Sequence, residues 1–201
     1  MLRGLLAGVL LLLTPDARAI EEPAFEVVLA GKDFELRRYA PYHIVSTPAG
    51  SVFEDTGDIG FRPLFRYISG GNAAGTDMAM TAPVLQTRHD DDWRLAFVVP
   101  AELGTEQIPA PTAPGMQVET VAGGLYAVRR FSGGWGESRF LDQESALTAA
   151  IAARGLVACG PTRYARYDPP FKPTFLRRNE ILILVAEDQC GPAGDVAAAA
   201  R

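Results

Sequence analysis

The chain is poor in the residue types from which most catalytic and metal sites are built. It contains two histidines and two cysteines in 201 residues, too few for a multi-histidine zinc site. It also lacks a G-x-S-x-G, H-E-x-x-H, C-x-x-C or Walker-type motif. The glycine-rich stretches at residues 69–71 and 132–134 join no parallel strand to a helix, so they indicate tight turns. These absences argue against the common enzyme classes and favour a binding protein.

The charge distribution and the hydrophobic runs narrow the choice further. The net charge is −5 without a long basic run, so the footprint of a nucleic-acid-binding protein is absent. The apolar run at residues 5–13 is too short to span a bilayer comfortably. It follows Arg3 and precedes an Ala-Arg-Ala sequence at residues 17–19, which matches a signal-peptide cleavage site. We therefore expect residues 1–19 to be a secretory signal peptide, and the mature protein to be periplasmic or secreted with no stable membrane anchor.

Residues 20–190 are expected to form a single domain. The chain is 48% hydrophobic and 21% charged, which suits one globular unit with a sizeable core. Residues 191–201 are rich in alanine and glycine and are expected to be a disordered tail.

The most informative stretch is residues 61–84. Its first part predicts a short amphipathic helix, and the Gly-Gly-Asn sequence at residues 70–72 suits the left-handed backbone that ends a helix. Residues 78–84 then predict a strand, with Pro83 at an edge, a bulge or the strand end. The helix is predicted from apolar residues at the spacing of one helix face: Phe61, Leu64, Phe65 and Ile68.

The YISGGN and MAMTAPV sequences within this stretch strongly resemble the SOUL haem-binding protein family. Three further segments fit the same family in the same order, and the set covers nearly all of the chain from Phe25 to Val185. These segments are FELRRY at residues 34–39, AVRRFSG at residues 127–133, and YDPPF at residues 167–171 leading to RRNE at residues 177–180. The resemblance implies an antiparallel β structure of eight or nine strands with two helices, and binding of haem or another tetrapyrrole.

Strand and helix signals repeat along the chain in the order strand, strand, helix, strand, strand. One set spans about residues 25–100 and the other about residues 116–187. In the second set, the strands at residues 116–121 and 125–131 are expected to pair. We predict an α+β fold in which this duplicated strand-strand-helix-strand-strand unit forms a distorted antiparallel β-barrel flanked by two helices.

The family resemblance also implies where the ligand lies. In the SOUL family the tetrapyrrole is thought to occupy a groove between the first helix and the last long hairpin loop, here residues 169–179. Haem requires a flat apolar slot and cations for its propionates. The resemblance therefore assigns ligand contacts to residues of the helix and the loop: Arg62, Leu64, Phe65, Ile68, Phe171, Lys172 and Arg177. For the apolar helix residues, ordinary core packing is the alternative role.

His43 is the candidate axial ligand of the haem iron, because iron binds a neutral imidazole. The alternative is a strand histidine that hydrogen-bonds locally. Met78 and Met80 share one face of their predicted strand, and methionine also ligates haem iron, although a pair at this spacing is typical of a core.

Arg37 and Arg38 are adjacent in a predicted strand, so strand alternation sends one of them inward. A buried arginine needs an acidic partner, for which Glu35 and Glu180 are the candidates.

Together these observations favour an exported, non-enzymatic protein that binds haem or another tetrapyrrole. Two alternatives remain open. One is a module that binds other flat hydrophobic small molecules. The other is an enzyme on the same scaffold, a hydrolase or a catalyst of porphyrin-metal chemistry, with Glu35 or Glu180 as the candidate general base.

Cys159 and Cys190 are predicted to form a disulfide. They are the two cysteines of the chain, and export would place them in an oxidising compartment. Cys159 precedes the strand predicted at residues 162–168, and Cys190 follows the strand predicted at residues 180–187. An antiparallel hairpin would bring both cysteines to the same end.

Overall fold

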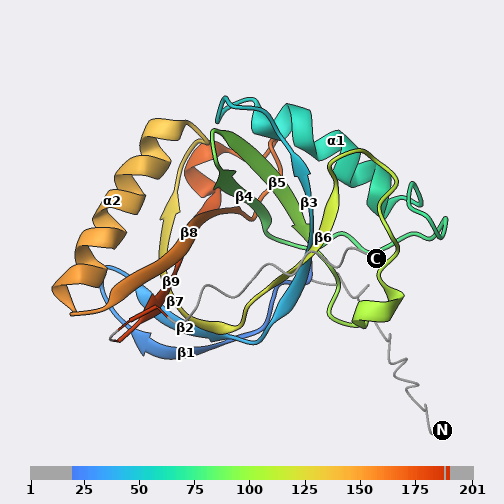
Figure 1. The fold of residues 1–201 in the computed structure, drawn as a ribbon. Helices are drawn as coiled ribbons and strands as arrows, with labels where there is room; N and C mark the ends of the chain where they lie inside the picture. The colour runs from blue at the N-terminus through green and yellow to red at the C-terminus, as the bar shows by residue number, and fades with distance from the viewer. Residues whose placement is uncertain (1–19, 188, 191–201) are drawn as a thin grey trace, which may run out of the picture.

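Figure 1 shows a strongly curved sheet with both helices on its outer side. The computed structural model describes residues 20–187 and 189–190, so the predicted signal peptide and the predicted tail lie outside the described residues. The helices are α1 (Thr56–Ile68) and α2 (Glu137–Ala153), with short 3-10 turns η1 (Thr105–Gln107) and η2 (Thr174–Leu176). The strands are β1 (Phe25–Ala30), β2 (Glu35–Tyr39), β3 (Tyr42–Pro48), β4 (Val84–His89), β5 (Asp92–Val98), β6 (Gln117–Val121), β7 (Gly124–Ser132), β8 (Val157–Arg166) and β9 (Arg178–Ala186).

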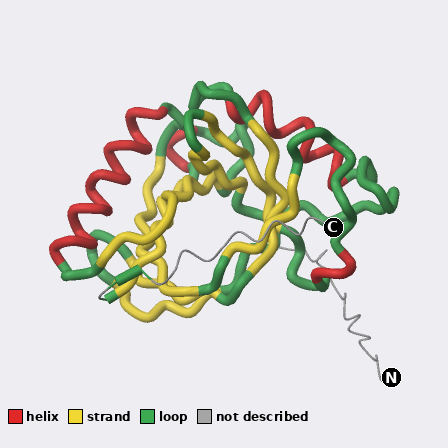
Figure 2. Tube along the Cα trace, in the orientation of Figure 1, coloured by secondary structure: helices red, strands yellow, loops and turns green. Residues whose placement is uncertain are grey.

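The nine strands of the described chain form one sheet in the order β1-β2-β7-β9-β8-β4-β5-β3-β6. Every neighbouring pair is antiparallel. The sheet is curled (Figure 2). Its edge strands β1 and β6 do not pair with each other, so the curl stays open as a half-barrel. This confirms the predicted α+β class and the barrel-like antiparallel sheet with two flanking helices.

The predicted pairing of β6 with β7 is wrong. β6 pairs with β3, whereas β7 lies between β2 and β9. The chain crosses from one part of the curl to the other at Gly123, where a Cβ atom would come within 2.9 Å of the Tyr39 carbonyl oxygen. A glycine is needed for this close approach, and the sharp crossing replaces the expected hairpin.

The strand order is symmetric about the β8–β4 pair. β7-β9-β8 on one side matches β3-β5-β4 on the other, and each flanking strand, β2 or β6, comes from the opposite half of the chain. The duplication itself stays a prediction, which superposing the two halves would test.

Each helix covers a different part of the outer face. α1 packs on β3 and β5 through Leu64 and Tyr67, whereas α2 packs on β7, β8 and β9 through Phe140 and Leu147. A third apolar cluster, which includes Tyr126, occupies the concave face. The outer face between the two helices is therefore left for other segments. Within the described ranges, no helix is long and apolar enough to cross a membrane.

α1 begins at Thr56, earlier than the predicted start at residue 61. Two glycines and a proline in its first two turns have poor helix propensity, so local sequence preference conceals the start. Gly60 is required by packing, since a Cβ atom there would lie 2.7 Å from the Cβ atom of Leu95 in β5. The predicted helix end is confirmed, because Gly70 follows with a positive φ of 82°.

The strand predicted at residues 78–84 is also wrong, because β4 begins only at Val84. The preceding segment is held instead by isolated contacts, such as the bond of 2.6 Å that the Thr81 hydroxyl donates to the Val98 carbonyl. Pro83 has no N–H to donate, which explains why regular pairing starts after it.

The predicted disulfide between Cys159 and Cys190 is confirmed, with Cα atoms 5.5 Å apart. The two cysteines are not ladder partners, because Cys159 lies opposite Leu184. An irregularity between Cys159 and Arg163 shifts the register, and Cys190 reaches Cys159 from beyond the end of β9. The bond closes the end of the β8–β9 hairpin opposite its loop.

Candidate ligand groove

A groove of about 560 Å³ lies on the outer face of the sheet beside α1. Its floor consists of side chains from three adjacent strands: Val84 of β4, Leu95 of β5 and Arg166 of β8. Because β4 lies between the strands that α1 packs on and those that α2 packs on, the groove lies between the areas that the two helices cover. The volume falls within the range of small-molecule and cofactor sites.

The walls of the groove are mainly apolar, with aromatic rings on three sides. Phe61 comes from α1, Trp135 precedes α2, and Phe171 belongs to the loop after β8. The side chain of Phe171 is 87% exposed, so its ring is free to cover a ligand. The remaining wall residues come from α1, from the segment before β4, from the loop and from the N-terminal segment: Ile20, Gly57, Asp58, Arg62, Met80, Thr81, Ala82, Tyr167, Asp168, Pro169 and Pro170.

Arg166 supplies the charge on the floor. Its guanidinium donates one hydrogen bond to the Gln86 side chain and lies 5.3 Å from the centroid of the Trp135 ring. Its Nε is buried without a hydrogen-bond partner, and within the described residues no carboxylate forms an ion pair with it. Desolvation lowers the pKa of Arg166 to about 10, against a weak opposing effect of Glu54. The groove therefore contains a buried cation that has no ion-pair partner among residues 20–187 and 189–190.

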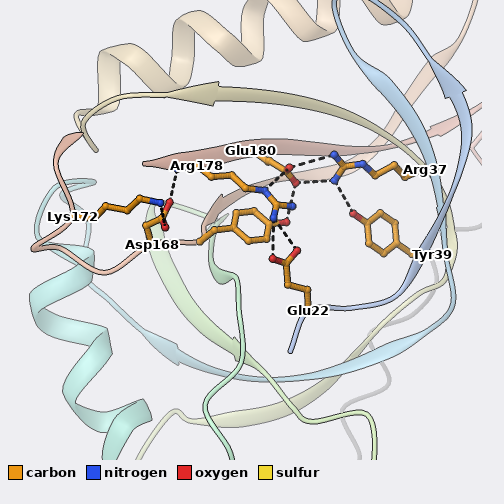
Figure 3. Close-up of polar contacts among 8 residues, drawn as sticks. Glu22, Arg37, Tyr39, Asp168, Lys172, Arg178 and Glu180 are labelled. Atoms are coloured by element: carbon orange, nitrogen blue, oxygen red, sulfur yellow. Dashed lines mark hydrogen bonds and ion pairs between the residues drawn. The ribbon is translucent and has the colours of Figure 1, made fainter. Parts of the chain in front are cut away.

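The concave face of the sheet carries a polar cluster in which, unlike in the groove, the arginines are paired with carboxylates (Figure 3). We call it the Glu180 cluster; it consists of Glu22, Arg37, Tyr167, Arg178 and Glu180. The fully buried Glu180 carboxylate accepts hydrogen bonds from Arg37 at 2.9 Å, Arg178 at 3.0 Å and the Tyr167 hydroxyl at 2.8 Å. Glu22 pairs with the outer side of Arg178 at 2.8 Å. The predicted acidic partner of the buried Arg37 is thereby confirmed as Glu180, with Glu35 as a second partner at 2.7 Å.

The pKa directions in this cluster follow from its pairing. Burial alone would raise the pKa of Glu180. The hydrogen bond and charge of Arg37 and the charge of Arg178 lower the pKa by more than burial raises it, so the carboxyl stays ionised. Burial and the Glu180 charge raise the pKa of Tyr167. An ionised carboxylate with its oxygens occupied is a poor general base, which weakens the enzyme alternative for Glu180.

Polar contacts fix the base of the loop between β8 and β9. Asp168 accepts a hydrogen bond from Lys172 at 2.6 Å and another from the backbone N–H of Arg178 at 2.5 Å (Figure 3). Arg177 donates to the Lys172 carbonyl at 2.8 Å and stacks on Trp135, 4.3 Å from the ring centroid. Asp168 borders the groove, so its bond to the Arg178 backbone joins one wall of the groove to the start of β9.

The structure brings two of the expected ligand contacts to the groove, Arg62 and Phe171. Lys172 and Arg177 lie in the same loop but do not border the groove. Their contacts with Asp168, the loop backbone and Trp135 brace the loop.

The other three helix residues that were expected to contact the ligand do not border the groove. Leu64 and Ile68 are buried in the core beneath α1 and do not reach the groove. Phe65 is 50% exposed outside the groove and stacks on Phe61 with ring centroids 6.0 Å apart. The buried stripe of α1 runs through Gly60, so Phe61 and Phe65 lie beside it.

His43 lies apart from the groove. Its Nε2 is 3.0 Å from the Thr105 hydroxyl and its Nδ1 is 3.1 Å from the Thr120 hydroxyl. Both ring nitrogens thus have local partners in this structure. Met80, in contrast, does border the groove. Among the described residues, no group of three or more His, Cys, Asp or Glu side chains is arranged to hold a metal ion.

Sequence reasoning missed Arg166 and Trp135 as groove residues. Arg166 stands directly before the YDPPF segment, at the end of β8. Arg163 in the same strand has the same charge, so the sequence pattern does not distinguish Arg166 as a groove residue. Trp135 follows two glycines in an irregular segment, and no periodic pattern indicates which surface its ring covers.

The curved antiparallel sheet with two outer helices is shared with several solved structures. The EcmrR C-terminal domain aligns with a TM-score of 0.60 at 13% identity, covering 76% of this chain and 96% of that one. A hydrolase from Listeria innocua aligns with a TM-score of 0.55 at 10% identity, covering 79% and 94% of the two chains. An uncharacterized conserved protein from Listeria innocua gives 0.57 at 10% identity, covering 77% and 93%. At these identities the likeness concerns the fold alone.

The family assignment comes from the sequence. The family described as SOUL heme-binding protein matches residues 20–184, most of the chain. The chain therefore belongs to the SOUL haem-binding protein family, which confirms the resemblance drawn from its motifs. No curated protein matches the sequence.

Proposed function

We propose that the protein binds haem or a related tetrapyrrole in the groove between α1 and the loop at residues 167–177. The observation that carries this proposal is the groove itself. The chain belongs to the SOUL family, and it has an apolar, aromatic-lined groove of about 560 Å³ between α1 and the loop that the sequence analysis expects to hold the ligand.

The residues of the groove fit such a ligand. Phe61, Trp135 and Phe171 offer apolar faces to a flat macrocycle, and burial of the macrocycle would provide the main favourable free energy. Arg62 on the wall and Arg166 on the floor offer positive charge to the carboxylates of a tetrapyrrole. A bound haem would supply an iron centre capable of further ligation, while the protein residues bury and orient the ring.

His43 as an axial iron ligand stays a hypothesis. Its two threonine partners would have to release one ring nitrogen for it to bind iron. Replacing His43 with alanine should shift the Soret band of the haem complex if the imidazole is the ligand. An unchanged spectrum would remove His43 from the site and leave the groove proposal intact.

We also propose that the protein is exported after cleavage of residues 1–19. The Cys159–Cys190 disulfide supports this proposal, because disulfides persist in oxidising compartments. Fractionation of cells that express the full chain should recover the mature protein outside the cytoplasm. A deletion of residues 1–19 should keep it in the cytoplasm with both thiols reduced.

The direct test of the ligand is a haem titration of the purified mature protein, followed by absorbance. We expect a saturable Soret change with one haem per chain at micromolar concentration or below. Linear, unsaturable absorbance across that range would contradict haem binding. The same titration with a flat, uncharged aromatic dye distinguishes haem from the alternative of a general binder for flat hydrophobic molecules.

A further inference from the structure

We propose that Arg166 is a carboxylate anchor at the floor of the groove, so that the ligand binds with an acidic side chain pointing inward. The inference rests on the proposed function and specifies its ligand class as flat macrocycles that carry a free carboxylate. It differs from the sequence-based expectation, in which cations of the helix and the loop hold the propionates.

The burial and the hydrogen bonding of Arg166 support this role. The residue is only 7% exposed, yet its guanidinium borders the groove. Its Nε has no partner, its Nη1 forms no hydrogen bond within the described residues, and its Nη2 donates to Gln86. A buried arginine normally has its donors paired, and a carboxylate is the group whose geometry matches a guanidinium best.

The surroundings of Arg166 bring its Nη1 close to the start of α1. A Cβ atom added at Gly57 would make an ordinary contact of 3.6 Å with Nη1, so the missing side chain of this glycine leaves that position beside the guanidinium unfilled. Two acidic residues also border the groove, Asp58 and Asp168. Asp168 is occupied by Lys172 and by the Arg178 backbone, and neither acid lies within ion-pair distance of Arg166. Glu54 affects Arg166 through its charge alone, so in the described part of the chain no carboxylate lies within ion-pair distance of this guanidinium.

Aromatic rings hold the guanidinium in place without neutralising its charge. Its central carbon lies 5.4 Å from the Phe53 ring centroid and 5.3 Å from that of Trp135. Cation–π contacts orient the group and leave its N–H edges free for an anion. An incoming carboxylate would thus find a fixed, desolvated donor set.

The experiment compares metal-free protoporphyrin IX with its dimethyl ester, so that iron ligation plays no part. Binding is followed by porphyrin fluorescence on the mature protein, with both compounds added at submicromolar concentration. For the wild type we expect the free acid to bind at least about tenfold more tightly than the diester, the effect of one buried charge-assisted hydrogen-bonded pair. Equal affinities of the two compounds would overturn the proposal.

Arg166→Met should remove this preference, bringing the two affinities within about twofold, while the diester binds as it does to the wild type. Arg163→Met is the matched control, because it removes the same charge from the same strand at a position that does not border the groove, and it should keep the preference. Retention of the preference in a folded Arg166→Met protein would overturn the assignment.

A second variant guards against misfolding. Arg166→Gln removes the charge but keeps a donor near Gln86, and it should lose the preference as well. Retention of the full preference in a folded Arg166→Gln protein would contradict the anchor. Failure of both porphyrins to bind the wild type would instead contradict the proposed function, so the two failures are distinguishable.

Discussion

Two buried arginines on opposite faces of the sheet show how one residue type serves two roles. Arg37 is 4% exposed and Arg166 is 7% exposed, so both are almost completely buried. Arg37 finds two carboxylates, Glu35 and Glu180, and a third contact in the Tyr39 hydroxyl at 3.4 Å. Arg166 finds one amide oxygen and aromatic rings. A completed network indicates a structural role, whereas an unneutralised cation beside a groove indicates a ligand.

The pKa values of the two guanidinium groups shift in opposite directions because only one of the groups has carboxylate partners. Burial disfavours the charge of both groups. For Arg37 the hydrogen bonds and charge of Glu180 exceed this cost and raise the pKa above its ordinary value. For Arg166 the desolvation dominates and the pKa falls to about 10. This difference agrees with the hydrogen bonding, because the Nε of Arg166 in the groove has no partner whereas Arg37 in the Glu180 cluster is paired.

Removing the central carboxylate of the paired network should have the largest effect on stability. We expect Glu180→Gln to lower the free energy of unfolding at pH 7 by about 3–5 kcal/mol, because it leaves the buried Arg37 and the partly buried Arg178 without their common partner. Urea denaturation measures the change. Glu35→Gln is the control, since that carboxylate is partly exposed, and its cost should stay below about 1 kcal/mol.

The same variant should alter the acid sensitivity of the protein. The pKa of Glu180 is lowered in the folded state from an ordinary value of 4.5, so its contribution is present above that value and is lost as the pH falls through the folded-state pKa. The stability difference between wild type and Glu180→Gln should therefore shrink between pH 5 and pH 2. A difference that grows on acidification would contradict the assigned ionisation.

Breaking the disulfide should cost slightly less and should separate stability from binding. The bond spans 31 residues of the hairpin that carries both Arg166 and Glu180. Cys159→Ser with Cys190→Ser should lower the free energy of unfolding by about 3–4 kcal/mol in the chain-entropy model. The haem affinity of the folded variant should stay within about twofold of wild type, because the bond lies at the hairpin end away from the loop. A large loss of affinity would show that the groove depends on the far end of the hairpin.

The smallest expected effect concerns the loop that covers the groove. Phe171→Ala should weaken haem binding about three- to tenfold, since the ring borders the groove but is largely exposed without a ligand. Phe175 in the same loop is 72% exposed and does not border the groove, so Phe175→Ala should change the affinity less than about twofold. Equal losses in the two variants would indicate that the loop acts through general hydrophobicity.

Local patterns predicted much of the fold. Residue alternation and glycine placement indicated most of the strand regions and both helices, and the cysteine positions indicated the disulfide. Local sequence could not reveal that β6 and β7 separate at Gly123, because the crossing depends on a contact with Tyr39, distant in the chain. The strand expected at residues 78–84 failed for a similar reason, since a tertiary hydrogen bond of Thr81 replaced the ladder.

The candidate site was less predictable than the fold. Helical spacing grouped Phe61, Leu64, Phe65 and Ile68, but the direction of the buried stripe depends on the approach of Gly60 to β5. Only the assembled structure separates the core residues of α1 from those that border the groove. Arg166 could not be identified from the sequence either, because tertiary packing decides whether an acidic side chain lies next to it.

The most direct test of the central claim, that the groove beside Arg166 holds the haem, is the haem affinity of Gly57→Leu. A side chain at Gly57 would extend toward Arg166 into the groove, and leucine also favours the helical state. We expect the affinity to fall by more than about tenfold without a loss of stability, while Ala146→Leu on the exposed face of α2 leaves it unchanged. Wild-type affinity in a folded Gly57→Leu protein would place the ligand elsewhere and contradict the account.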